Sequence, residues 1–129
     1  SVEGISRVLR VPPTRFPSTP VHHLLNDGDI LTSVMGGLHV VATPGHAMGH
    51  VAFWQPERRL LITGDTMMHL LGKLRLPIPV VTVDMTENRR SIARLAELDA
   101  EVAAFGHGKP LMQNTAQKIR DFARRVRAH

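Results

Sequence analysis

Short runs of consecutive apolar residues occupy the middle of this sequence and limit the folds that it can adopt. The runs lie at 38–43, 51–54 and 60–63. Strands of this composition are typical of sheets that are covered on both faces. The Gly36-Gly37 pair separates the first run from a further predicted strand at 30–34. We therefore expect a sheet built mainly from antiparallel hairpins.

Helical patterns follow only in the second half of the chain. Thr86 is a candidate N-cap for a helix at about 87–98, whose apolar residues recur on one face. A strand is predicted at 101–105 and a second helix at 114–127. The apolar stretch 67–76 has no regular period and is expected to be a loop or short helix. The order is therefore several strands, a helix, a strand and a helix.

The composition bounds the class of protein. The 129 residues suit one domain, and four prolines within 1–20 predict an extended connector ahead of a folded portion at 21–129. No apolar run is long enough to span a membrane, and no signal peptide is recognised. With no cysteine, disulfides and thiolate metal ligands are excluded, and a cytoplasmic location is expected.

The formal net charge of +5 has two interpretations. Basic residues concentrate in the tail at 118–127, which would suit nucleic acid or an anionic substrate. The alternative is the solvated face of a terminal helix. The second interpretation is favoured, because the tail lacks interleaved aromatic residues that could stack on bases.

Three motifs that could carry chemistry each follow an apolar run directly. They are Thr43-Pro44-Gly45-His46-Ala47-Met48-Gly49-His50, Thr63-Gly64-Asp65 and Phe105-Gly106-His107-Gly108-Lys109-Pro110. Glycine beside each candidate ligand permits a tight turn and a close approach of the backbone. Strands of one sheet would bring the three loops to one edge. Two imidazoles and a carboxylate there would suit zinc, iron or manganese.

In this order, the motifs resemble the third, fourth and fifth signature motifs of the metallo-β-lactamase superfamily. The resemblance implies an αβ/βα sandwich made of two similar halves. This chain would be the C-terminal half, with a mixed, mostly antiparallel sheet and two helices. It also implies a metal site at the edge of the sheet, with two zinc ions favoured and iron or manganese as alternatives.

The resemblance also implies roles for individual residues. His46 corresponds to a ligand of the first metal, Asp65 to the aspartate that bridges both metals, and His107 to a ligand of the second. His50 lies where many members have a histidine that does not bind metal directly, so it is a candidate for contacting the ligands. The leading His-x-His-x-Asp-His motif of the family is absent from this sequence.

The expected function is part of a metal-dependent hydrolase that uses a metal-activated water. The substrate would be a small molecule such as an ester, thioester, lactone or phosphodiester. With the leading motif absent, this chain alone is expected to be inactive. The alternatives are a non-catalytic truncated module that serves assembly, and a nucleic-acid-processing member of the superfamily, although nucleic acid is disfavoured as a partner.

Packing adds an expectation about assembly. The two predicted helices can cover one face of the sheet, and the other face would be left as an open apolar patch. We therefore expect this chain to pair with a missing N-terminal half or to self-associate as a homodimer, and no membrane partner is expected.

Overall fold

The main sheet is built from the predicted apolar runs of the first half of the chain and from one strand of the second half. The computed structural model describes residues 25–127, so the predicted connector at 1–20 lies outside the described residues. The five strands of the main sheet run in the order β1-β2-β3-β4-β7. They are β1 (Ile30–Leu31), β2 (Leu38–Ala42), β3 (Val51–Gln55), β4 (Leu60–Ile62) and β7 (Val102–Ala104).

Strand directions in this sheet are mixed. Each consecutive pair from β1 to β4 is antiparallel, with Val40 opposite Phe53 and Phe53 opposite Ile62. β7 pairs with β4 in parallel, with Leu61 opposite Ala103. The predicted mixed, mostly antiparallel sheet is therefore confirmed. Two strand reversals separate β2 from β4, so β2, β4 and β7 all end at one edge of the sheet.

The prediction of a loop or short helix at 67–76 was wrong. This stretch forms a separate two-stranded sheet of β5 (Met68–Leu70) and β6 (Lys73–Arg75). Leu71 and Gly72 make the turn between them, with φ angles of 53° and 74°. Positive φ at both central residues is the geometry that tight hairpins favour. Leucine rarely adopts it, so the sequence carried a weak hairpin signal. A short 3-10 helix, Pro79–Val81, follows.

Two helices follow the hairpin, as predicted. α2 (Met85–Leu95) begins one residue before the proposed Thr86 cap, because the Asp84 side chain accepts the cap hydrogen bond from the Glu87 backbone N–H at 3.1 Å. α3 (Thr115–Arg127) agrees closely with its predicted range. No helix within residues 25–127 is long and apolar enough to cross a membrane.

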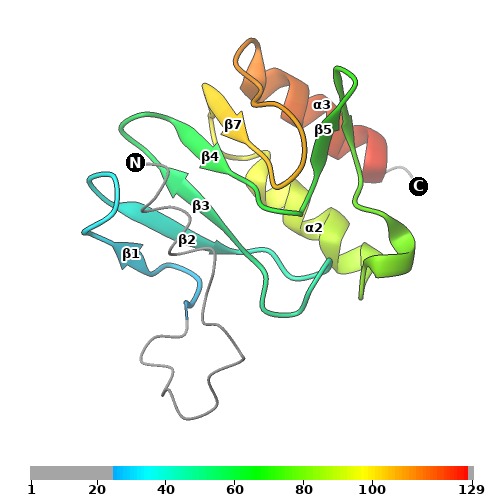
Figure 1. The fold of residues 1–129 in the computed structure, drawn as a ribbon, viewed down its shortest axis with the longest axis horizontal. Coiled ribbons are helices and arrows are strands. Elements are labelled where there is room, and N and C mark those ends of the chain that lie inside the picture. The colour runs from blue at the N-terminus through cyan, green and yellow to red at the C-terminus, as the bar shows by residue number, and fades with distance from the viewer. Residues whose placement is uncertain (1–24, 128–129) are drawn as a thin grey trace.

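The helices cover one face of the main sheet (Figure 1). Ala52 and Leu61 on the strands pack in one cluster with Ile92 of α2 and with Ile119 and Phe122 of α3. All five side chains are at most 2% exposed. Burial of apolar surface at about 25 cal/mol per Å² makes this cluster a main source of stability.

The opposite face of the sheet is also closed. Leu38, Val40, Phe53 and Ile62 form a second cluster and are at most 5% exposed. The partly buried residues packed against it are Leu25, Leu31, Val34, Met35, Val51, Leu60 and Ala104. The expectation of an open apolar patch on this face was therefore wrong. The prediction that the strands are covered on both faces is confirmed.

Candidate metal site

The three sequence motifs meet at one edge of the main sheet. β2, β4 and β7 end at Ala42, Ile62 and Ala104, and one motif follows each strand. The β7 loop and the β4 loop are joined by the hydrogen bond from the Gly106 backbone N–H to the Gly64 carbonyl, at 2.9 Å.

The carboxylate of Asp65 lies between two imidazoles. Its Oδ2 is 3.8 Å from Nε2 of His46, and its Oδ1 is 3.5 Å from Nε2 of His107. Two ligands of one tetrahedral zinc ion are themselves about 3.4 Å apart, since each bond is about 2.1 Å long. The separations are therefore close to those of paired metal ligands. The structure brings all three predicted side chains together.

The number of ligands is small. Among residues 25–127, no three His, Cys, Asp or Glu side chains form a group able to hold one metal ion. Asp65 faces the two histidines through different oxygens, so each of two candidate metal positions has two ligands. A catalytic zinc site takes three protein ligands as a rule. The donor types fit zinc, iron or manganese, and the described residues alone do not complete such a site.

The imidazole of His46 is oriented by Thr82, which the sequence analysis did not identify. The Thr82 hydroxyl donates to the Ile78 carbonyl at 2.8 Å, so its oxygen accepts from Nδ1 of His46 at 3.2 Å. This pattern places the proton on Nδ1 and leaves the Nε2 lone pair toward Asp65. Such a partner fixes both the tautomer and the direction of a ligating ring. The two residues are 36 positions apart, and no local pattern links them.

His50 contacts Asp65 through the backbone. Its Nε2 accepts from the Asp65 N–H at 3.0 Å, and its Nδ1 lies 2.7 Å from the Thr43 hydroxyl oxygen. Nε2 is therefore the acceptor, and the ring proton is assigned to Nδ1. Burial lowers the pKa of His50; Asp65 opposes this shift and His46 adds to it. Burial of the ring therefore favours its neutral form.

Gly106 makes room for the carboxylate. A Cβ atom at this position would lie 2.1 Å from Oδ1 of Asp65. Any side chain at Gly106 would therefore displace Asp65 from its place between the histidines.

His69 and Lys109 lie outside this cluster. Nδ1 of His69 donates to the Lys109 carbonyl at 2.8 Å, and the ring packs against Phe105 with centroids 5.5 Å apart. Asp84 is also outside the cluster, and its side chain caps α2.

Comparison with known proteins gives the family. The family model described as Metallo-beta-lactamase superfamily matches residues 2–107. A hydroxyacylglutathione hydrolase of Brucella anthropi is 30% identical over 96 residues, covering 73% of this chain and 34% of that protein. The probable metallo-hydrolase YflN of Bacillus subtilis is 31% identical over 98 residues, covering 67% of this chain and 37% of that protein.

Solved structures also match this chain in fold. A metallo-beta-lactamase family protein from Thermus thermophilus superposes with a TM-score of 0.60 at 33% identity, covering 81% of this chain and 35% of that one. The protein TTHA1623, solved in a di-iron-bound form, has a TM-score of 0.57 at 29% identity, covering 73% and 44%. This chain belongs to the metallo-beta-lactamase superfamily and has its fold. It spans 34% to 44% of the length of the first curated relatives that it matches.

Proposed function

We propose that this chain forms part of a metal-dependent hydrolase in which His46, Asp65 and His107 bind metal. The observation that carries the proposal is the position of the Asp65 carboxylate, with one oxygen facing each imidazole at 3.8 and 3.5 Å. Imidazole and carboxylate ligands suit zinc, iron and manganese. Zinc is the favoured metal, and iron and manganese are the alternatives.

The chemistry follows from the ligand set. A metal ion held there would supply Lewis acidity, which lowers the pKa of a bound water toward about 7 and polarises an acyl oxygen. The residues of this chain would do the positioning. His46 would present Nε2 because Thr82 holds Nδ1, and Asp65 would be held by the neutral His50 ring.

A small molecule with an ester-type bond is the proposed substrate class. Relatives named hydroxyacylglutathione hydrolase and, at 26% identity, atrochrysone carboxyl ACP thioesterase favour a thioester over a lactone or phosphodiester. We also propose a cytoplasmic location for this protein.

The remaining metal ligands would come from outside residues 25–127. Each candidate metal position has only two ligands among the described residues, which is fewer than a metal site needs. The proposed source is an N-terminal half of the fold or a second copy of the chain. The second candidate function, a non-catalytic module that serves assembly, rests on the same count.

Metal binding and turnover test the proposal separately. Zinc titration followed by calorimetry should show binding that His46→Ala, Asp65→Asn and His107→Ala each weaken and that His39→Ala leaves unchanged. Equal zinc affinity in all four variants would disprove the ligand assignment.

In a thioester hydrolysis assay, this chain alone should be no faster than its His46→Ala, Asp65→Ala double variant. Metal-dependent turnover by the single chain that the double variant loses would show that the described ligands suffice.

A further inference from the structure

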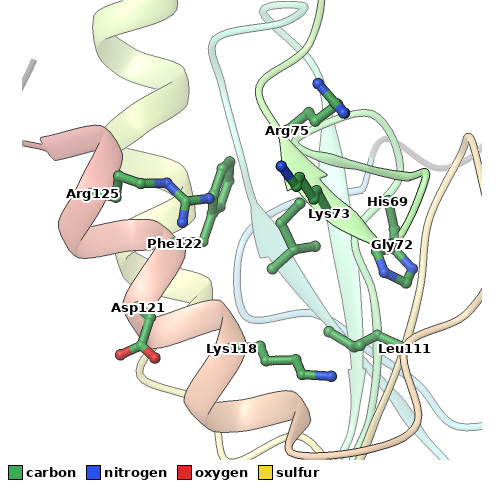
Figure 2. A pocket seen from close by; sticks show the side chains of 10 residues that line it. His69, Gly72, Lys73, Arg75, Leu111, Lys118, Asp121, Phe122 and Arg125 are labelled. Atoms are coloured by element: carbon green, nitrogen blue, oxygen red, sulfur yellow. The ribbon is translucent and has the colours of Figure 1, made fainter.

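A hollow with several cationic side chains lies between the β5–β6 hairpin and α3, and none of the three candidate metal ligands lines it. Its volume is about 580 Å³, which is within the range of small-molecule pockets. Lys73 and Arg75 line it from β6, and Lys118 and Arg125 line it from α3 (Figure 2). Four cations from two separate elements therefore surround one cavity.

These four cations lack carboxylate partners in the described part of the chain. No ion pair within residues 25–127 involves Lys73, Arg75, Lys118 or Arg125. Four other arginines of the described chain do each pair with an Asp or Glu: Arg59, Arg90, Arg94 and Arg124. Arg125 lies over an aromatic ring, that of Phe122, at 5.3 Å from its centroid. The positive charge of the hollow is therefore not neutralised by pairing.

The one carboxylate in the lining does not change this balance. Asp121 accepts hydrogen bonds from Gln117, at 2.8 Å, and from Arg124. Both partners lie on α3, and neither lines the hollow. Asp121 is thus already satisfied by its own helix.

Apolar and polar atoms complete the walls. Leu111 and Phe122 are buried at 5% and 2% exposure and lie beside the cations (Figure 2). His69 stands at one side, and its Nδ1 is engaged by the Lys109 carbonyl, so its Nε2 is the nitrogen left for a ligand. The hollow thus combines charge for an anionic group with apolar surface for the rest of a small molecule.

We propose that this hollow is a binding site for a phosphate-bearing small molecule. Four unpaired cations suit a group with two or more negative charges, and guanidinium and ammonium groups bind phosphate oxygens through charge-assisted hydrogen bonds. The ligand would lie beside the loop that carries His107, since the His69 backbone N–H donates to the His107 carbonyl at 3.3 Å. The proposal does not depend on the proposed hydrolase activity.

Pyrophosphate binding tests the site. Calorimetry would use the intact protein, treated with chelator and carrying His46→Ala and Asp65→Ala, so that pyrophosphate cannot bind through metal at the other site. We expect saturable binding at one site. Lys73→Gln and Lys118→Gln should each weaken it about tenfold, as the loss of one charge-assisted bond implies. Lys118→Arg should retain most of the affinity.

Arg120→Gln is the matched control, because Arg120 is an exposed cation of α3 that does not line the hollow. It should leave pyrophosphate affinity within about twofold of the parent. Absence of saturable binding would overturn the proposal. So would an equal loss in Arg120→Gln and Lys118→Gln, which would indicate diffuse attraction. A single-stranded oligonucleotide that binds more tightly than pyrophosphate, and depends on Arg120 as well, would replace the small-molecule site by a nucleic-acid surface.

Discussion

Nε2 of His50 accepts a hydrogen bond from the backbone N–H of Asp65 at 3.0 Å, and this contact joins two of the three motif loops. The other ring nitrogen meets the hydroxyl of Thr43, directly after β2. The imidazole therefore links the ends of β2 and β4. Its effect is to hold the backbone of the central carboxylate residue.

Removal of this imidazole should weaken metal binding without removing a proposed ligand. In His50→Ala the Asp65 N–H loses its acceptor, and zinc affinity should fall by about 10- to 100-fold, as for other partners of metal ligands. In His50→Gln a side-chain oxygen remains that can accept the same bond, so the loss should be smaller. Calorimetric zinc titration measures both.

His39→Ala is the control for loss of a histidine, since His39 is a partly buried residue in β2 and makes no contact with the three candidate ligands. Unchanged zinc affinity in His50→Ala would contradict the positioning role.

Gly106→Ala should affect the site more than the fold. The new Cβ would lie 2.1 Å from Oδ1 of Asp65, and the nearest backbone atom, the Gly64 oxygen, would be 3.2 Å away. The carboxylate must therefore move. We expect zinc affinity to fall about tenfold or more, with a loss of only about 1 kcal/mol in the free energy of unfolding. Zinc titration and urea unfolding of the same samples separate the two effects; a collapse of stability would contradict this expectation.

Gly45→Ala should act in the opposite way and destabilise the fold itself. Gly45 has φ of +140°, and a Cβ there would lie 2.3 Å from the backbone nitrogen of Asn88 in α2. Neither backbone can yield easily, so we expect a loss of about 3 kcal/mol or more in urea unfolding. Gly49→Ala is the matched control in the same loop: a Cβ there meets nothing within 4 Å, so its effect should stay within about 0.5 kcal/mol.

Features determined by short-range patterns were predictable from the sequence. Continuous apolar runs gave the strands, and the position of each motif after a strand led to the expectation that His46, Asp65 and His107 meet. The common direction of β2, β4 and β7 accounts for that meeting, and their role as metal ligands remains a prediction.

Features that depend on tertiary contacts were not predictable. Thr82 contacts His46 although the two residues are 36 positions apart, and no periodic sequence pattern relates such distant residues. The turn of the β5–β6 hairpin contains Leu71 at a positive φ angle, and leucine rarely adopts this conformation. The N-cap at Asp84 was missed because Asp and Thr are both accepted N-cap residues, so the local pattern allowed the helix to begin after either one.

Asp27 connects α2 with the residue before the first motif, and this contact makes the stability of the fold depend on pH. Asp27 accepts a hydrogen bond from the Ala42 N–H at 2.9 Å and another from Arg94 of α2 at 3.0 Å. These bonds, the Ala42 bond first, hold the pKa of Asp27 below its ordinary value of 3.8. The unfolded chain therefore binds a proton at Asp27 more readily than the folded protein does. The stabilisation is full above the unfolded pKa of about 3.9 and is lost as pH falls through the lowered folded value.

Asp27→Asn should have a lower melting temperature than the parent by a constant amount between about pH 5 and pH 7, and this difference in melting temperature should narrow below about pH 3.9. Thermal melts across this pH range measure it, with Asp29→Asn as a neighbouring carboxylate control. A gap that stays constant down to about pH 2 would contradict the ionic origin of this contact.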